Sequence, residues 1–335
     1  MGFPIGTHFG AKIWCNLDPC GLVCASLTMG LIIYAQYTIT AAILIPWFEW
    51  SVTGLILFLA YNTLAVMAII SQNKAMLTDP GAVCKDAIPM GDEEEIIEEP
   101  ACRRERESRN YRRWCRRCKN YKPPRAHHCS ICMRCVIKMD HHCPWVNNCV
   151  GALNHKFFLQ FISYIFTLCL FTLILIFLRF TTCAKSEDQG CGDPGNNMFI
   201  IMVILEAILF GLFTSCMMLD QWTVVSTNVT SIDKLKGARA PVGGEAAFNE
   251  VCGGRAFPTF RWDYLLPSAV DYPSDLQIDF FGYCQPINGD NNDGEEEHEL
   301  EILAMENGQK REKRKTANDK EDIPPPSTSV SQKDD

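Results

Sequence analysis

Residues that could bind a metal ion or act as nucleophiles crowd into one stretch of the chain, from Cys115 to Cys149. This stretch holds seven of the eighteen cysteines and four of the seven histidines. A tetrahedral structural zinc site takes four Cys or His ligands, so two sites need eight of these eleven side chains. If six cysteines and two histidines are used, one cysteine and two histidines remain. A free thiol beside a free histidine combines a nucleophile with a base.

The candidate ligands follow an ordered spacing rather than forming an isolated Cys-x-x-Cys pair. The series runs Cys115-x2-Cys118, His128-Cys129-x2-Cys132-x2-Cys135 and Asp140-His141-His142-Cys143-x5-Cys149. It resembles the cysteine-rich domain of the DHHC protein S-acyltransferases (palmitoyltransferases), whose name is the tetrapeptide at 140–143. The similarity continues through Lys122-Pro123, Arg125, Pro144-Trp145-Val146, Asn148, Gly151, Asn154 and Phe158.

The resemblance implies which side chains hold metal, a point that spacing alone leaves open. One structural Zn²⁺ would be bound by Cys115, Cys118, His128 and Cys135. The second would be bound by Cys129, Cys132, His142 and Cys149. Both sites would have four protein ligands and no open position, so zinc would be a scaffold rather than a Lewis acid.

The same resemblance implies a catalytic role for the remaining thiol. Cys143 would be the nucleophile, His141 its base and Asp140 the group that orients His141. Cys143 would take a fatty acyl group from acyl-CoA, such as palmitoyl-CoA, and a protein cysteine would then take it from Cys143. This two-step exchange of thioesters predicts ping-pong kinetics and needs neither ATP nor a redox cofactor. The expected partners are cytosolic or membrane-associated proteins with cysteines close to the bilayer.

Further residues are expected to support this chemistry. Thr230-Ser231-Ile232-Asp233 resembles a conservative variant of the family's Thr-Thr-x-Glu motif, which would place Ser231 near the catalytic aspartate. Asp-Pro-Gly at 79–81 resembles another family motif, and its plain interpretation is a turn. The supporting residues are thus Asp79, Pro80, Gly81, Asn154, Thr230, Ser231 and Asp233. The residues expected at the mouth and wall of an acyl cavity are Trp145, Phe158 and Phe161.

Four stretches are long and apolar enough to cross a bilayer, which takes about 20 residues. They are Leu22–Trp47, Val52–Ile70, Phe157–Phe180 and Met198–Trp222. The predicted fold is therefore an α-helical integral membrane protein with four transmembrane helices. A loop-rich cytosolic domain with two zinc ions lies between helices 2 and 3. Glu206 falls inside the fourth span, where we expect a structural or neutralised role rather than catalysis.

Basic residues predict the orientation of these spans. The segment 71–155 carries 15 Lys and Arg, whereas 48–51 carries none and 181–197 carries only Lys185. Because cytosolic loops are enriched in Lys and Arg, the cysteine-rich segment and both termini should face the cytosol of an endomembrane (Golgi, ER, endosome or vacuole) or of the plasma membrane. The reducing cytosol favours metal ligation of its thiols. Cys183 and Cys191 would lie in the lumenal loop, with or without a disulfide.

The chain therefore divides into five expected parts. Residues 1–70 contain a short cytosolic lead without a strong signal and the first two spans, and 71–156 contain the zinc domain with its core at 115–149. Residues 157–222 hold the last two spans, and 223–287 form a cytosolic segment. Residues 288–335, with 14 acidic and 7 basic side chains, are expected to be disordered.

The formal net charge of −8 says little about partners, because the tail at 288–335 accounts for most of it. The segment 103–138 has 13 basic and 2 acidic residues, so the surface around the zinc domain is cationic. Nucleic acid is an improbable partner for a basic segment that is fixed at the bilayer surface. The basic residues available for the phosphates of CoA are Arg112, Arg113, Arg116, Arg117, Lys122 and Arg125.

Two other interpretations of the zinc domain stay open at this point. A membrane-anchored RING-type ubiquitin ligase also interleaves two zinc ions, but it normally closes with a second Cys-x2-Cys pair, and none follows Cys149. A DHHC-type scaffold without acyl transfer is the other. The intact tetrapeptide from Asp140 to Cys143 argues against it.

Overall fold

The structure is a computed structural model that describes residues 5–9, 11–49, 51–88, 114–185, 194–237, 245–253, 262–270, 272 and 283. The predicted disordered tail at 288–335 lies outside the described residues, as does Cys191. Cys183, near the end of the third span, is disulfide-bonded.

Four helical spans are long and apolar enough to cross a membrane, which confirms the predicted number. The first consists of α1 (Pro19–Thr38), the π-helical η1 (Ile39–Leu44) and α2 (Ile45–Phe48), and the others are α3 (Val52–Leu77), α5 (His155–Lys185) and α6 (Pro194–Thr227). Each helix that leads to or from the zinc domain is longer than its apolar stretch. For example, α3 continues past Ile70 to Leu77.

Local capping explains where the first two spans begin. The Asp18 side chain accepts a hydrogen bond from the Gly21 N–H at 2.7 Å, and Pro19 occupies the first helical position, where its missing N–H costs nothing. Ser51 caps α3 in the same way, accepting from the Gly54 N–H at 3.2 Å. A polar cap therefore marks the start of each of these two spans, which hydropathy alone leaves vague.

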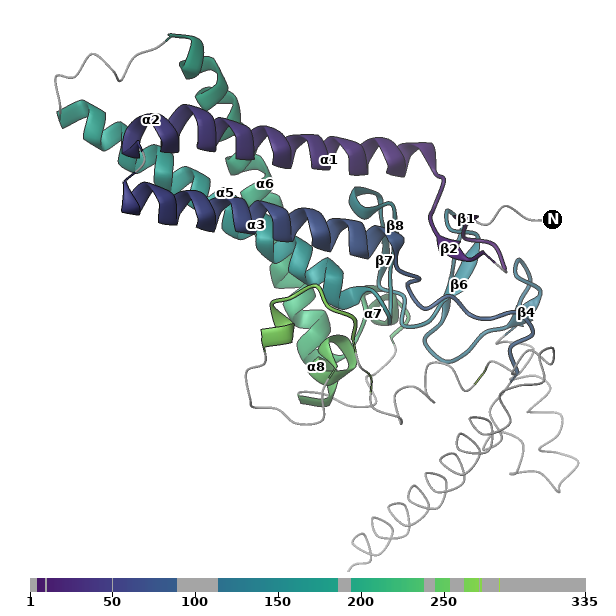
Figure 1. The fold of residues 1–335 in the computed structure, drawn as a ribbon. Coiled ribbons are helices and arrows are strands. Elements are labelled where there is room, and N and C mark those ends of the chain that lie inside the picture. Colours follow the sequence, from purple (N-terminus) through teal and green to yellow (C-terminus); the bar gives the residue numbers. More distant parts are fainter. Residues whose placement is uncertain are drawn as a thin grey trace, which may run out of the picture. The chain divides into compact units, whose positions relative to one another are not determined.

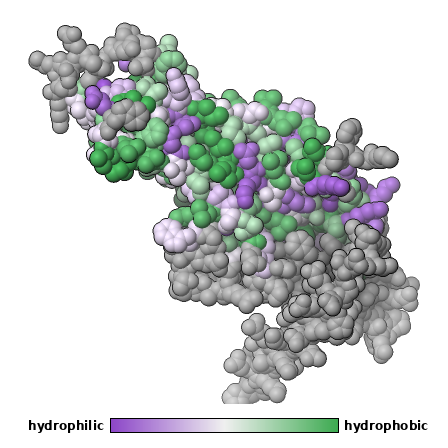
Figure 2. Space-filling model, viewed as in Figure 1, coloured by the Kyte–Doolittle hydropathy of each residue, from purple (hydrophilic) through white to green (hydrophobic). Residues whose placement is uncertain are grey.

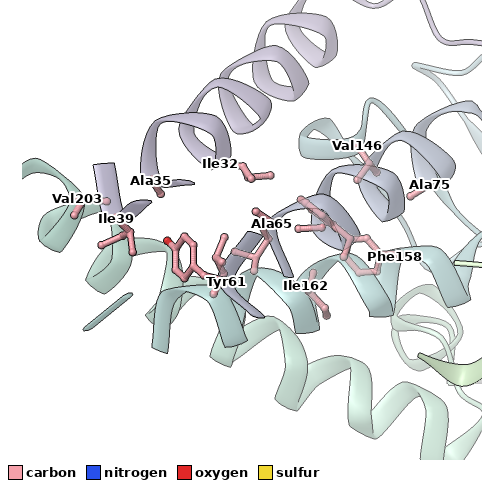
Figure 3. Close-up of a cluster of buried hydrophobic side chains, with 14 of the residues drawn as sticks. Ile32, Ala35, Ile39, Tyr61, Ala65, Ala75, Val146, Phe158, Ile162 and Val203 are labelled. Atoms are coloured by element: carbon pink, nitrogen blue, oxygen red, sulfur yellow. The ribbon is translucent and has the colours of Figure 1, made fainter. Parts of the chain in front are cut away.

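The helices pack around a shared apolar core in which α3 lies along α5 and α5 lies along α6 (Figure 1). Figure 3 shows part of this core, with Ile32 and Ile39 of the first span close to Tyr61, Ala65 and other side chains. The buried Tyr61 hydroxyl is hydrogen-bonded to Oγ1 of Thr172 at 2.8 Å, so the one polar atom of this ring is satisfied.

Large apolar side chains also cover the outer faces of the helices (Figure 2). Val23 is 68% exposed, Leu212 is 66% exposed and Phe180 is 70% exposed. A water-soluble protein rarely exposes so much contiguous apolar surface, whereas lipid solvates it well. These outer faces agree with the hydropathy of the spans, and together they identify a multi-pass membrane protein.

The cysteine-rich segment folds as three two-stranded antiparallel hairpins near the end of α3 (Figure 1). Their strands are β3 (Trp114–Cys115) with β4 (Asn120–Tyr121), β5 (His127–Cys129) with β6 (Arg134–Val136), and β7 (His141–Cys143) with β8 (Asn148–Val150). A parallel pair, β1 (Ile5–Gly6) and β2 (Ile13–Trp14), precedes α1. After α6 come α7 (Ser231–Leu235), α8 (Glu245–Cys252) and η5 (Trp262–Tyr264).

Two asparagines attach the zinc domain to the end of α3. Asn148 Nδ2 donates to the carbonyls of Ala75 and Thr78 at 3.0 and 2.9 Å. Asn154 Nδ2 donates to the carbonyls of Ala75 and Cys149 at 3.1 and 2.7 Å. These bonds satisfy carbonyls that the last turn of a helix leaves without partners. They also fix the position of the zinc domain at the C-terminal end of the second span.

Candidate active site

The first metal-binding group consists of Cys115, Cys118, His128 and Cys135. The register of β5 and β6 places His128 opposite Cys135, and the three sulfurs lie 3.6, 3.2 and 3.9 Å from His128 Nδ1. Zn–S bonds of about 2.3 Å and Zn–N bonds of about 2.0 Å put the edges of a tetrahedron near 3.5 Å. The donor set and its dimensions therefore fit a structural zinc ion.

The second group, Cys129, Cys132, His142 and Cys149, has the same dimensions. The register of β7 and β8 places His142 opposite Cys149, and the sulfurs of the three cysteines lie 3.6, 3.4 and 3.7 Å from its Nδ1. The two groups alternate along the sequence, so each zinc ion would join two hairpins. Both ligand sets that the sequence analysis expected therefore come together in space.

The N-terminal lead contacts the second metal-binding group, although its residues carry no strong signal in the sequence. Trp14 Nε1 donates to Asn148 Oδ1 at 2.9 Å, and Asn16 Nδ2 donates to the Cys132 sulfur at 3.7 Å. Hydrogen bonds to a ligand sulfur orient the ligand and stabilise its thiolate. A single Trp or Asn before a membrane span carries no pattern that would have revealed this contact.

Cys143 belongs to neither metal-binding group. It ends β7, is 5% exposed and lies just before the short 3-10 helix η3 (Pro144–Val146). His141, two residues earlier on the same strand, points to the same face of the hairpin and interacts with the Cys143 side chain. The structure thus holds the surplus thiol beside the surplus histidine.

Asp140 and His141 form a tight pair. His141 Nδ1–H donates to Asp140 Oδ2 at 2.8 Å, which leaves Nε2 as the ring nitrogen for the thiol. Burial opposes both charges, yet the mutual hydrogen bond and the nearby Cys143 raise the pKa of His141 to about 9. Although burial also opposes its ionisation, hydrogen bonds from His141 and from the Ser231 N–H hold the pKa of Asp140 below its usual range. The contacts within the pair therefore favour the charged forms of both groups.

Two polar residues that the sequence analysis did not single out complete this arrangement. Gln221 of α6 donates from Nε2 to Asp140 Oδ2 at 2.9 Å. Gln221 Oε1 accepts in turn from His155 Nε2 of α5 at 2.6 Å, and both residues are buried. Gln221 sits at the end of the fourth apolar stretch and His155 just before the third. Their positions at the edges of apolar spans could have indicated a role for both residues, because polar residues in spans usually face the protein interior.

Ser231 lies beside Asp140, as the resemblance implied, but its backbone makes the contact. The Ser231 N–H donates to Asp140 Oδ1 at 2.7 Å. Thr230 caps α7, since its Oγ1 accepts from the Asp233 N–H at 3.2 Å. The helix N-terminus thus directs a free N–H at the carboxylate, which favours its charged form.

The Asp233 carboxylate pairs with residues of the zinc domain. It accepts from Arg125 Nε at 3.0 Å and lies 3.3 Å from His127 Nε2. Burial opposes the negative charge, but His127 and Arg125 together lower the pKa of Asp233 to about 2. Arg125 also donates to the Asn228 carbonyl at 2.7 Å. Its guanidinium is therefore engaged within the protein and is a poor candidate for a CoA phosphate.

A second ion pair joins α8 to the zinc domain. Lys138 is 3% exposed, and its Nζ lies 2.6 Å from Glu250 Oε2. Glu250 also lies 3.7 Å from Arg125. Of the other basic residues offered for CoA, Arg112 and Arg113 lie outside the described residues.

The Asp-Pro-Gly sequence forms the predicted turn. Asp79 Oδ1 accepts from the N–H groups of Gly81 and Ala82 at 2.9 and 2.7 Å, and Gly81 has φ of +97°. The Gly81 carbonyl accepts from the Ile137 N–H at 2.8 Å, and the Pro80 carbonyl accepts from Leu153 at 3.3 Å. The turn therefore redirects the chain from α3 onto the zinc domain.

An apolar cavity lies between the helices. It is lined mainly by aliphatic side chains of α1, α5 and α6, and by Glu206, whose buried Oε2 has no hydrogen-bond partner among the described residues. The three residues expected at its mouth and wall are not among the lining residues but lie nearby. The Phe158 ring is 5.3 Å from that of His141, and the Trp145 ring is 6.1 Å from that of Phe210, which lines the cavity. Phe161 is buried in the same apolar core.

Comparison with known proteins matches residues 108–238 to the family model described as "DHHC palmitoyltransferase". The chain is 40% identical over 238 residues to "Palmitoyltransferase ZDHHC7" of Mus musculus, covering 70% of this chain and 74% of that protein. It is 39% identical over 236 residues to "Palmitoyltransferase ZDHHC3" of Homo sapiens, with the same coverage of 70% and 74%. A plant relative, "Probable protein S-acyltransferase 14" of Arabidopsis thaliana, is 36% identical over 194 residues, covering 55% of this chain and 62% of that protein.

Proposed function

Because this chain belongs to the DHHC palmitoyltransferase family and is a protein S-acyltransferase, we propose that Cys143 is the residue that carries the acyl group. One observation supports this assignment above all others. Cys143 is excluded from both complete metal-binding groups and lies beside the pair formed by His141 and Asp140. Every other cysteine of the 115–149 segment belongs to one of those groups.

In the first step, the thiolate of Cys143 attacks the thioester carbonyl of a long-chain acyl-CoA, and the CoA thiolate leaves. An imidazolium beside a thiol favours the anionic nucleophile, and its proton can pass to the departing thiolate. Asp140 keeps His141 charged and oriented, while Gln221 and the Ser231 N–H hold Asp140. In the second step, a cysteine of the protein substrate attacks acyl-Cys143 and restores the free thiol.

The residues of both metal-binding groups fit zinc, which would supply structural rather than catalytic chemistry. Four protein ligands fill each group, so no position is open for a substrate. The hairpins have few apolar residues of their own, and binding free energies of about 10–16 kcal/mol per site are typical of such small zinc folds. The task of the metal ions would be to hold β7, and with it His141 and Cys143, in place.

The apolar interior of the membrane protein explains why a long-chain acyl-CoA is a suitable acyl donor. Each buried methylene of an acyl chain contributes about 0.8 kcal/mol, so a palmitoyl chain favours an apolar site over water. The cavity between α1, α5 and α6 is a suitable site for the chain. In support, Trp145, Phe158 and Phe161 belong to the same apolar core as Cys143, and the Trp145 ring packs on Phe210, which lines the cavity. The charged head of acyl-CoA would stay on the basic, cytosolic side.

This geometry supports one class of protein substrate. The acyl-Cys143 thioester would lie where the zinc domain meets the helices, so an acceptor thiol must reach the bilayer surface from the cytosol. Cysteines next to a transmembrane helix or to a membrane anchor satisfy this condition. A RING-like ligase is not favoured, because its function would leave the arrangement of Asp140, His141 and Cys143 without a purpose.

Incubation of the purified protein in lipid nanodiscs with a labelled palmitoyl-CoA tests the proposal. We expect a label at Cys143 that hydroxylamine removes, and a loss of that label in Cys143→Ala. Cys216→Ser, which removes an exposed thiol of α6, is the matched control and should label normally. If Cys143→Ala takes up as much label as the wild type, the assignment of the nucleophile is wrong.

A further inference from the structure

A series of buried hydrogen bonds begins at His155, the first residue of α5, and ends at the pair formed by Asp140 and His141. His155 Nε2 lies 2.6 Å from Gln221 Oε1, and Gln221 Nε2 lies 2.9 Å from Asp140 Oδ2. Asp140 Oδ2 in turn lies 2.8 Å from His141 Nδ1. The exposed fractions of His155, Gln221 and Asp140 are 2%, 0% and 1%, so bulk water does not compete for these bonds.

The charge of Asp140 determines the direction of every bond in this series. An ionised carboxylate only accepts hydrogen bonds, so Gln221 must turn its NH2 group toward Asp140 and its oxygen toward His155. The amide oxygen also only accepts, so His155 Nε2 must carry a proton and donate it to this bond. A half-turn of the amide group would exchange its oxygen and nitrogen in nearly the same space. His155 therefore selects the amide orientation that suits a carboxylate.

His155 is itself held by the turn that joins β8 to α5. Its N–H donates to the Gly151 carbonyl at 3.2 Å, and the preceding Asn154 donates to the Cys149 carbonyl at 2.7 Å. A Cβ at Gly151 would lie 2.4 Å from the Pro80 carbonyl oxygen, so this turn packs closely against the turn that follows α3. The donor at Nε2 therefore comes from a fixed point, where the zinc domain joins the third span.

We propose that His155 is a positioning residue for acyl transfer, which acts on Asp140 through the orientation of the Gln221 amide. The inference rests on the proposed function, in which Asp140 orients His141 beside Cys143. Without a donor at position 155, the buried Gln221 oxygen loses its partner, and a half-turn of the amide would direct that oxygen at the Asp140 carboxylate. Both states weaken the hold on Asp140, because a buried unpaired acceptor and two facing acceptors are each unfavourable.

Acylation kinetics of the full-length protein in lipid nanodiscs test this role with a matched pair of variants. The side chains in His155→Met and His155→Gln have similar lengths, but only the second can donate a hydrogen bond near the place of Nε2. We expect His155→Met to lower the rate constant for acylation of Cys143 by labelled palmitoyl-CoA about ten-fold, while the KM for acyl-CoA stays within about two-fold of the wild-type value. His155→Gln should retain at least about half of the wild-type rate constant.

A double variant shows whether His155 acts through Gln221. Once Gln221→Leu has removed the amide, His155→Met should lower the rate no further, because the link to Asp140 is already lost. Zinc content and melting temperature check that each variant folds. If His155→Met does not fold, His155→Asn takes its place, since the shorter amide puts its nitrogen nearer to the position of Nδ1 and does not reach Gln221.

The opposite results overturn the inference. An unchanged rate in His155→Met shows that the donor is not needed, and equal losses in His155→Met and His155→Gln show that the ring matters for packing alone. Losses that multiply in the double variant show that His155 does not act through Gln221. An unlabelled Cys143 in the wild type would instead refute the proposed function.

Discussion

Gln221 donates a hydrogen bond to Asp140 over 2.9 Å, which ties the fourth membrane span to the first residue of the DHHC sequence. We expect Gln221→Leu to lower the rate of Cys143 acylation about ten-fold or more, because a hydrogen bond to a charged group contributes about 1.5–3 kcal/mol. The KM for acyl-CoA should change little, since Gln221 orients the catalytic pair and does not line the cavity. Pre-steady-state labelling measures both quantities. Trp222→Leu, which alters the exposed neighbour, is the control; an unchanged rate in Gln221→Leu would contradict the orienting role.

Gly21 of α1 packs closely against Asn147, in the segment after Cys143. A Cβ at this position would lie 2.0 Å from Asn147 Oδ1, whereas a Cβ at Gly30 of the same helix meets nothing within 4 Å. We expect Gly21→Ala to lower both the melting temperature and the acylation rate. Gly30→Ala should be neutral or slightly stabilising, because alanine is favoured over glycine in helices by about 1 kcal/mol. Equal behaviour of the two variants would show that this contact is unimportant.

Loss of a ligand from either metal-binding group should release only the zinc ion of that group, but it should abolish acylation of Cys143 in both cases. We expect Cys115→Ser and Cys132→Ser each to reduce the zinc content from two ions to one per chain, measured by mass spectrometry of the metal. Both variants should also lose acylation of Cys143, because each ion joins two hairpins. Cys143→Ala should retain both ions. A loss of zinc in Cys143→Ala would place its sulfur among the ligands and refute the assignment.

Lys138 and Glu250 form a buried ion pair between the zinc domain and α8, with 2.6 Å between Nζ and Oε2. Removing one partner leaves a buried charge, which typically costs about 3–5 kcal/mol. We therefore expect Glu250→Ala to lower the melting temperature by several degrees. The double variant with Lys138→Met and Glu250→Leu should recover much of this loss. Additive losses in a double-mutant cycle would indicate that the two residues do not interact.

Glu206 presents an unpartnered buried oxygen in the wall of the apolar cavity. It lies about 22 Å along α6 from Gln221, a distance comparable to an extended palmitoyl chain. An unsatisfied buried oxygen costs about 1–3 kcal/mol, so Glu206→Leu should favour chains long enough to reach this depth. Competition between stearoyl-CoA and palmitoyl-CoA measures the shift. Glu206→Gln keeps a polar group there and should retain the wild-type ratio; the same ratio in Glu206→Leu would place the chain elsewhere.

Much of this protein was accessible from its sequence, because the relevant signals are local. Zinc ligands occur in short, regular spacings. The sequence predicted only a loop-rich domain around them, and the hairpin registers that place His128 opposite Cys135 and His142 opposite Cys149 became visible in the structure. Membrane spans are continuous apolar stretches whose number can be read from hydropathy. The roles of Cys143, His141 and Asp140 followed from resemblance to a family, and they remain predictions for this chain.

The tertiary structure alone decided which distant residues complete the site. Asp140 and Gln221 are 81 residues apart, Lys138 and Glu250 are 112 apart, and Trp14 and Asn148 are 134 apart. A single Gln, Glu or Trp forms no repeating pattern in the sequence, so the sequence does not identify its distant partner. These contacts form because the helices and hairpins pack in one arrangement, and burial then makes an unpaired polar group so costly that most of them are paired. The spacing of Cys and His residues therefore determined which reactive groups are available, and tertiary packing determined which distant residues orient them.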